Sequence, residues 1–353
     1  MLKLIKYIDL IRIFIAILIG FILTIGIIYG VSEDASTTIW YFFLGPFSNI
    51  SGMGNIFETA TPLILTAVGT AIAFQAGLIY IGAGGAIFIG ATMGTLIAIF
   101  SNAPTFIHIP FILLVALLAG AFIGYIPGYL RVKLRIHEFI SSLMLNYIAT
   151  FVGIYIIKYY ARDMAAALLQ SRELPKTAWF LRIIPGTRIH LGFILAIILS
   201  LLAYFFLYHT RWGYEIRMVG KNADFARFNG IDVNKVIVIS TTLAGATAGI
   251  AGISEIMGIY HRFQWKALPC FSLEGILVVI IARNNPLLII PVSFLIAYLK
   301  TGAQYAALIG DIPSEIVTII ISIIVFLVTA ELFLEKWKQR LTFKEATKDE
   351  LRS

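Results

Sequence analysis

The side chains best placed to handle a polar ligand are the few polar and ionisable groups that interrupt long apolar stretches. Asn146, Glu255 and Glu274 each lie within such a stretch, and Tyr80 lies just before another. An ionisable group is costly in an apolar environment and marks a functional site by default. We therefore expect Asn146, Glu274 and Glu255 to line a pathway for a polar solute, with Tyr80 offering that solute an aromatic face.

Three of these residues also have a structural explanation. Asn146 would form a hydrogen bond to a neighbouring helix. Glu274 would contact the end of a broken helix, and Tyr80 would pack in the interior. Sequence spacing alone leaves both kinds of role open.

Signatures of enzymatic chemistry are absent from the sequence. The stretch V-G-K-N at 219–222 is not a Walker A loop, because Asn222 replaces the Ser or Thr that would hold the metal ion. No H-E-x-x-H motif occurs, and the single cysteine, Cys270, excludes a disulfide framework and a multi-cysteine metal site. We therefore expect no catalysis and no cofactor.

The composition is that of a membrane protein. Apolar residues make up 59% of the 353 residues and charged residues 13%, whereas a soluble domain carries about 25% charged residues. The net charge of +8 comes from short clusters between apolar runs rather than from one basic face. The clusters therefore favour contact with anionic lipid over nucleic acid.

Long apolar runs predict an all-α polytopic membrane helix bundle that occupies residues 1–353 as one transmembrane domain. The first run is too long for a signal peptide, so we interpret it as a retained span. The eighth segment is short and stops before Pro286, as a half-helix within the protein would. Ten spans are expected, near 10–30, 56–76, 86–100, 108–130, 139–157, 189–209, 236–260, 270–282, 286–300 and 313–332.

Lys and Arg set the expected orientation. With both termini in the cytoplasm, 18 basic residues lie inside and 9 outside, in agreement with the positive-inside rule. The loop 210–235 is then cytoplasmic and the loop 158–188 extracytoplasmic. The second loop carries six basic residues and is expected to be a small surface-lying piece.

Within loop 210–235 the sequence predicts a helix of about two turns. Asn222 is a good N-cap, Asp224 suits the first turn, and Gly230 is placed to end the helix. Phe225 and Phe228 are three residues apart and share one face. That face would fill a groove in a partner protein or, alternatively, fold back on the membrane surface.

The loop resembles the coupling loop of ABC-transporter permeases for simple sugars and nucleosides, a family related to ribose and branched-chain amino-acid permeases. Further stretches match in family order: T-P-L-I-L-T at 61–66, H-E at 137–138, M-L-N-Y-I-A at 144–149, a glycine-rich stretch at 243–252 and N-P at 285–286. The stretch 77–86 departs from the family pattern, with Tyr80, Gly84 and Ala86 where Asn, Glu and Gln are usual. The resemblance implies that the ATPase-coupling residues are Arg217, Gly220, Asn222, Phe225, Ala226, Arg227, Phe228 and Gly230.

The resemblance further implies a permease of the bacterial inner membrane that passes a small uncharged solute, such as a nucleoside or a simple sugar. Its expected partners are a second, similar permease in a heterodimer, two ATP-binding cassette subunits, an extracytoplasmic solute-binding protein and membrane lipid. The alternative is a secondary transporter driven by an ion gradient. That alternative predicts inverted repeats and a charge relay at the membrane midplane, and the sequence shows only one broken-helix candidate.

Overall fold

The computed structural model describes residues 22–101, 103–310, 319 and 322–323. The expected span 313–332, apart from three residues, and the part of the expected first span before residue 22 lie outside the described residues.

Within that described part, the secondary structure is helical apart from two isolated bridges, Arg162 with Ser171 and Arg182 with His190. The all-α class is confirmed. In chain order the elements are α2 Ala35–Phe43, η1 Gly45–Phe47, α3 Ile50–Gln75, α4 Ala83–Phe100, α5 Thr105–Leu134, α6 Glu138–Ile156, η2 Ile157–Ala161, η3 Lys176–Ala178, α7 Leu191–His209, α8 Arg211–Lys221, α9 Ala223–Phe228, α10 Val233–Glu255, η4 Ile256–Tyr260, α11 Phe271–Ile281 and α12 Pro286–Ile309.

Seven helices of the described residues are long and apolar enough to cross a membrane, and they match seven of the ten expected spans. The eighth expected span is α11, which has only 11 residues. Its rise of about 16 Å falls short of a hydrocarbon core of about 30 Å. The chain leaves α11 through Arg283 and Asn284, both left-handed with φ of 52° and 59°, and Pro286 then starts α12.

The described residues divide into two compact units, residues 22–52 with those from 298 onward, and residues 53–297. In the first unit, Gly302 lies against the carbonyl oxygen of Phe42 and Gly45 lies against the ring of Tyr305. The Tyr298 hydroxyl donates a 2.9 Å hydrogen bond to the carbonyl oxygen of Phe43. The second unit holds the residues on which function is argued below.

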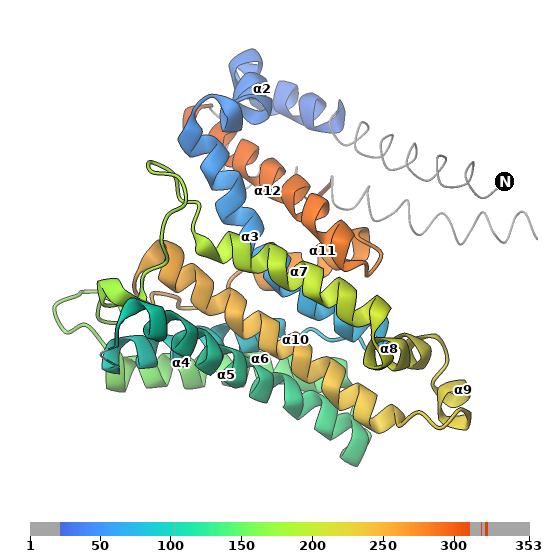
Figure 1. Cartoon of the computed structure of the whole chain (residues 1–353). Helices are drawn as coiled ribbons and strands as arrows, with labels where there is room; N and C mark the ends of the chain where they lie inside the picture. The colour runs from blue at the N-terminus through green and yellow to red at the C-terminus, as the bar shows by residue number, and fades with distance from the viewer. Residues whose placement is uncertain (1–21, 102, 311–318, 320–321, 324–353) are drawn as a thin grey trace, which may run out of the picture. The chain divides into compact units, whose positions relative to one another are not determined.

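The centre of the second unit is the packing of α10 against α5 and α4 (Figure 1). Gly120 and Gly124 of α5 face Gly245 and Gly249 of α10, and we call these four residues the glycine seam. A Cβ at Gly245 would lie 2.3 Å from the carbonyl oxygen of Gly120 and 2.8 Å from the Cα of Gly124. The four-residue spacing therefore brings the two backbones into direct contact, as such spacing does in membrane helices.

The segment between α6 and α7 packs onto η4, which continues α10, and onto the residue that follows it. The backbone N–H groups of Leu174 and Phe180 donate to the carbonyl oxygens of His261 and Met257, at 2.9 and 3.0 Å. Burial, and then the charges of His261 and Arg182, lower the pKa of His190 to about 4. His190 is therefore neutral near pH 7, and its ring stacks on Phe180 at 5.7 Å.

Candidate coupling site

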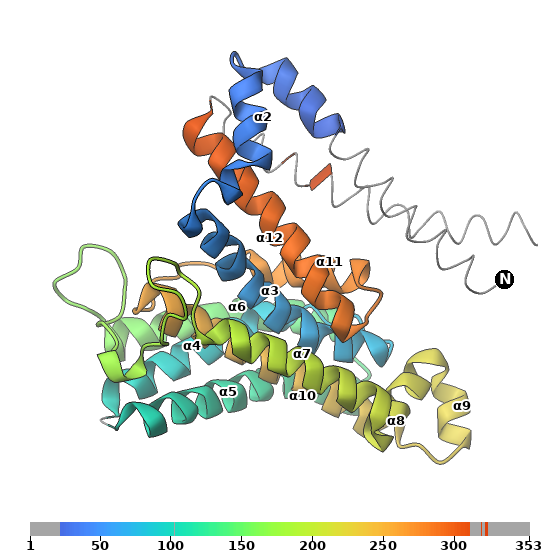
Figure 2. The same ribbon diagram turned by 45° about the horizontal axis from the view of Figure 1, so that its top comes forward.

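The loop 210–235 forms two helices, α8 and α9, which project beyond the ends of α7 and α10 (Figure 2). The short helix predicted after Asn222 is present, but α8 was not predicted. Thr210 caps α8, because its hydroxyl accepts the N–H of Gly213 at 3.2 Å. Asn222 ends α8 and caps α9, with its Oδ1 accepting the N–H of Phe225 at 2.9 Å. One residue therefore sets the angle between the two helices.

The C-terminus of α9 is as the sequence predicted. Gly230 has a left-handed φ of 79°, which favours glycine. The N–H of Ile231 donates to the carbonyl oxygen of Ala226 at 3.1 Å, which is the long hydrogen bond of a Schellman motif. The helix is therefore stopped after two turns and the chain is turned towards α10.

The outward face of α9 carries the two predicted aromatic rings. Ala226 is fully buried, whereas Phe225 is 53% and Phe228 90% exposed. Arg227 lies 4.0 Å from Asp224, but an exposed pair of this kind adds little stability. The described chain therefore leaves both rings uncovered on a helix whose position is fixed by its caps.

Gly220, near the end of α8, lies directly against the end of α3. A Cβ at Gly220 would be 2.0 Å from the carbonyl oxygen of Gln75 and 3.0 Å from the backbone nitrogen of Gly77. Gly77 itself has a φ of 75°. We call this contact of Gly220 with Gln75 and Gly77 the joint.

Gln75 extends the joint to two further elements. Its Nε2 donates to the carbonyl oxygen of Asn284, before α12, at 3.0 Å, and to the Tyr208 hydroxyl of α7 at 3.3 Å. The guanidinium of Arg217 lies over the Tyr208 ring at 4.9 Å, a cation–π contact. Arg217, which the family resemblance placed among the coupling residues, therefore contacts α7.

After the joint the chain is non-helical until α4 begins at Ala83. Backbone groups in a membrane protein need partners, and here α6 supplies them. The N–H of Ile79 donates to Glu138 at 3.0 Å, and the N–H of Ile81 to the Ser142 hydroxyl at 3.4 Å. Glu138 is itself paired with Arg131.

Asn146 continues this pattern one turn further along α6. Its Oδ1 accepts the N–H of Gly85 at 2.7 Å, and its Nδ2 donates to the carbonyl oxygen of Ile81 at 3.0 Å. Glu138, Ser142 and Asn146 are four residues apart and form one face, which we call the polar row. The described structure thus uses both ends of the Asn146 amide to hold the segment 78–85.

The other expected pathway residues lie in different settings. The ring of Tyr80 is fully buried, and a Cβ at Gly82 would meet it at 2.6 Å. Glu274 is partly exposed in the first turn of α11, while Glu255 ends α10 and is 5% exposed.

Gly84 lies between Asn146 of α6 and Ser272 at the start of α11. A Cβ there would lie 3.3 Å from the Ser272 hydroxyl and 3.6 Å from the Asn146 amide carbon. The structure therefore brings the polar row close to the start of α11, where Glu274 lies.

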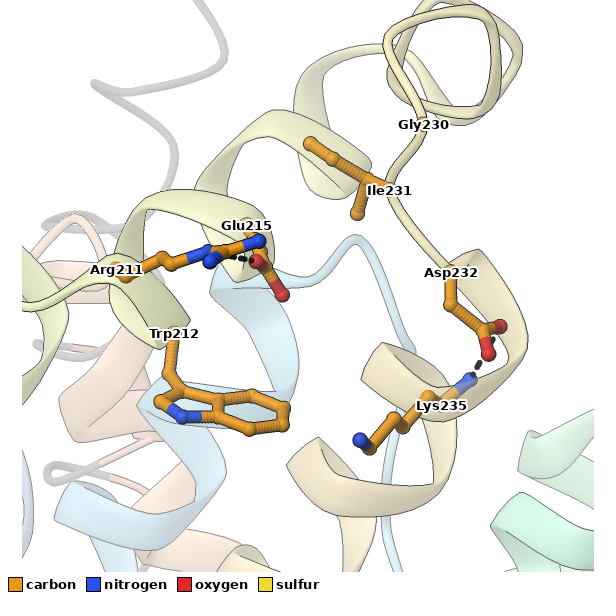
Figure 3. Close-up of a pocket in the computed structure, with 7 residues that line it drawn as sticks. All are labelled: Arg211, Trp212, Glu215, Gly230, Ile231, Asp232 and Lys235. Atoms are coloured by element: carbon orange, nitrogen blue, oxygen red, sulfur yellow. Dashed lines mark hydrogen bonds and ion pairs between the residues drawn. The ribbon is translucent and has the colours of Figure 1, made fainter.

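A hollow of about 330 Å³ opens between the start of α8 and the start of α10 (Figure 3). The ammonium of Lys235 lies 4.9 Å from the centre of the Trp212 ring. The hollow is lined by Arg211, Trp212, Glu215, Gly230, Ile231, Asp232 and Lys235.

Sequence reasoning did not find Gln75, Gly77 or Tyr208. The one available signal was a polar residue followed by Ala and Gly at the end of an apolar helix, which is typical of a C-cap. Their contacts join residues far apart in the chain, and spacing does not predict such contacts.

Apolar helices of spanning length, a glycine-packed bundle and two capped helices beyond the span ends, α8 and α9, are the features of a multi-pass membrane protein. The family model described as "Branched-chain amino acid transport system / permease component" matches residues 52–329, and the chain belongs to this family. It is therefore a permease subunit of an ABC importer, a transport component rather than an enzyme, and a gradient-driven transporter is not favoured.

Curated relatives agree with this family. The chain is 32% identical over 290 residues to the guanosine ABC transporter permease protein NupP of Bacillus subtilis, covering 81% of this chain and 83% of that one. It is 29% identical over 334 residues to the nucleoside ABC transporter permease protein NupB of Lactococcus lactis, covering 91% of both chains. It is 29% identical over 293 residues to the glucose ABC transporter permease protein TsgB13 of Haloferax volcanii, covering 80% of this chain and 77% of that one. No solved structure matches significantly. The family implies partnership with ATPase subunits and a solute-binding protein.

Proposed function

We propose that residues 1–353 act as one permease domain of the bacterial inner membrane with both termini in the cytoplasm. It pairs with a second, similar permease in a heterodimer and receives solute from an extracytoplasmic binding protein. Two ATPase subunits bind the pair, one of them at the loop 210–235 of this chain. The proposal is supported by the basic residues, of which 18 lie on the expected cytoplasmic side and 9 on the other.

The observation that carries the coupling role is the pair of rings on α9. Phe228 is 90% exposed on a helix capped at both ends, and exposed aromatic anchors commonly dominate protein interfaces. The rings would fill a groove on the ATPase subunit. Arg217, Gly220, Asn222, Ala226, Arg227 and Gly230 would hold α8 and α9 in the geometry that presents them.

The joint supplies the next step of the proposed mechanism. Because Gly220 lies against the backbone of α3, a displacement of α8 would push on Gln75 and Gly77 without an intervening side chain. The segment 78–85 follows directly, and the polar row fixes it to α6. ATP binding would in this way move the wall of the pathway near Asn146 and the start of α11, with Glu274, Glu255 and Tyr80 as further proposed pathway residues.

The proposed solute is a small, uncharged, hydroxyl-rich molecule such as a nucleoside or a simple sugar. The relatives are named for guanosine, nucleosides and glucose. The stretch 77–86 has Tyr80, Gly84 and Ala86 where the family usually has polar side chains, so the pathway offers the solute few strong contacts. Weak contacts suit release, and selectivity would then lie mainly with the binding protein.

The test is reconstitution of the complex with its ATPase subunits and binding protein in vesicles. ATP hydrolysis is measured over a panel of nucleosides, sugars, amino acids and organic anions. Stimulation by a nucleoside or a sugar is the expected result. Stimulation by a charged amino acid or an anion alone would overturn the solute assignment.

A further inference from the structure

The hollow beside α8 lies at the level where two spans end. The span-length helix α7 ends at His209 and the span-length helix α10 begins at Val233. Arg211 and Trp212 follow within three residues of the end of α7, and Lys235 lies in the first turn of α10. All three side chains are therefore close to the boundary between hydrocarbon and water, where Trp and basic residues are enriched.

Two cationic side chains that line the hollow, Arg211 and Lys235, can bind an anion. The carboxylate of Glu215 accepts from Arg211 at 3.1 Å, and that of Asp232 accepts the backbone N–H of Lys235 at 3.1 Å (Figure 3). No carboxylate in the described part of the chain lies within ion-pair distance of the Lys235 ammonium, which sits over the Trp212 ring. The Arg211 side chain is 89% exposed, so its remaining N–H groups can bind a further anion.

An exposed apolar stripe leads along α7 to this point. Its members recur at helical spacing and are 44–59% exposed. The stripe ends at Phe205, whose ring stacks on that of His209 with 5.2 Å between the ring centres. His209 lies two residues before Arg211. The stripe consists of Ile194, Ile198, Leu201, Leu202 and Phe205.

We propose that the hollow binds the headgroup phosphate of an anionic phospholipid whose acyl chains lie along the α7 stripe. The phosphodiester would accept from the Lys235 ammonium and Arg211, which are charge-assisted hydrogen bonds. The lining carries two cations and two carboxylates, so the phosphate would bind through these two side chains and not through a net positive charge of the hollow. The inference rests on the proposed function, which places the loop 210–235 at the cytoplasmic surface.

The occupied hollow would have a consequence for coupling. Gly230, Ile231 and Asp232, which connect α9 to α10, line the same hollow. A bound headgroup would restrain this connection and steady α9 for docking. A carboxylate of the ATPase subunit could bind the same cations, but it would not cover the apolar stripe of α7. The cations and the stripe together therefore favour a lipid.

The test is native mass spectrometry of the full chain, alone and in complex with the ATPase subunits, after exposure to phosphatidylglycerol or phosphatidylcholine. The variant Arg211→Gln/Lys235→Gln is compared with Lys133→Gln/Lys221→Gln, which removes the same charge from two other exposed residues on the expected cytoplasmic side. We expect phosphatidylglycerol retention to fall about tenfold in the first variant only, and Lys235→Arg to retain the lipid.

Equal phosphatidylglycerol retention by wild type and both double variants would overturn the lipid site. So would loss of the ATPase subunits from Arg211→Gln/Lys235→Gln with lipid retention unchanged, because the hollow would then be a protein contact. Since retention is also measured on the chain alone, failure of ATPase assembly would count against the proposed function and not against the lipid site.

Discussion

The glycine seam and the joint both rely on glycine, but they differ in extent. In the seam, backbone contact is repeated along α5 and α10, with Gly120 against Gly245 and Gly249, and Gly124 against Gly245. A shift that brought any residue other than glycine into these contacts would press its Cβ against backbone atoms of the other helix. We infer that α5 and α10 behave as one rigid body.

The joint has one point of backbone contact. Gly220 lies against Gln75 and Gly77, and the surrounding links are the hydrogen bonds of Gln75 and the stacking of Arg217 on Tyr208. Such a contact transmits a push and permits rotation. Close packing at glycine therefore holds a bundle together when it is repeated, and it can serve as a pivot when it occurs once.

The largest expected effect on solute uptake is at the two exposed rings of α9, where the ATPase subunit would push on the joint. Replacing both rings, in Phe225→Ala/Phe228→Ala, should lower uptake by at least about a hundredfold, because interface anchors of this kind contribute 2 kcal/mol or more each. Co-purification of the ATPase subunits and solute uptake in vesicles measure the effect. The control is Phe106→Ala, since Phe106 is also 90% exposed but lies at the start of α5. Wild-type uptake by the double variant would mean that α9 is not the coupling element.

In the glycine seam, substitution should lower the stability of the protein and leave transport by the folded protein unchanged. Gly245→Ala places a methyl group against the Gly120 carbonyl, and overpacking of this kind costs about 1–3 kcal/mol. A lower midpoint of thermal unfolding in detergent is expected, with normal uptake per folded molecule. The control is Gly26→Ala, where no described atom lies within 4 Å of the added carbon. A variant with wild-type stability but lost uptake would place coupling in the seam.

In the joint, substitution should lower transport and leave stability nearly unchanged. Gln75→Leu removes the hydrogen bonds to Asn284 and Tyr208, so we expect normal ATPase assembly and basal ATP hydrolysis, with solute moved per ATP reduced about tenfold. Each lost hydrogen bond costs about 1 kcal/mol, which limits the loss of stability. Gln170→Leu, in the loop before α7, is the control. An unchanged ratio of transport to hydrolysis would show that the hydrogen bonds of the Gln75 side chain play no part in coupling.

The smallest effect on coupling is expected at the polar row. Asn146→Leu leaves the N–H of Gly85 without its acceptor, at a cost of about 1–3 kcal/mol. Ser142→Ala loses the 3.4 Å bond from the N–H of Ile81 and the 3.1 Å bond from its hydroxyl to the Phe139 carbonyl oxygen within α6, and it should cost less. Thermal unfolding measures both variants. If Asn146 only positions the segment 78–85, the ranking of solutes in the ATPase panel will not change; a changed ranking would make it a solute contact.

The sequence predicted the elements whose signals are local. The cap at Asn222, the stop at Gly230 and the short α11 before Pro286 each depend on neighbouring residues, and the structure has all three. The helix α8 was missed because its strongly polar sequence was interpreted as a loop.

The role of Asn146 shows where local reasoning ends. A polar group in an apolar helix needs a partner, and the sequence does not say which one. Its partners, Ile81 and Gly85, are more than sixty residues away in the chain, as are the partners of Gln75. Such contacts are set by how whole helices pack, and residue types and spacing alone do not determine them.

The most direct measurement is of movement in the segment after the joint. A spin label at Ile79→Cys, whose native side chain is 53% exposed, is placed in a Cys270→Ser background in the assembled complex. Trapping the ATPase with ATP and vanadate should change the label's mobility, and Gln75→Leu should abolish the change while a label at Phe106→Cys stays constant. An unaltered spectrum at position 79 in a complex that still transports solute would contradict coupling through the joint.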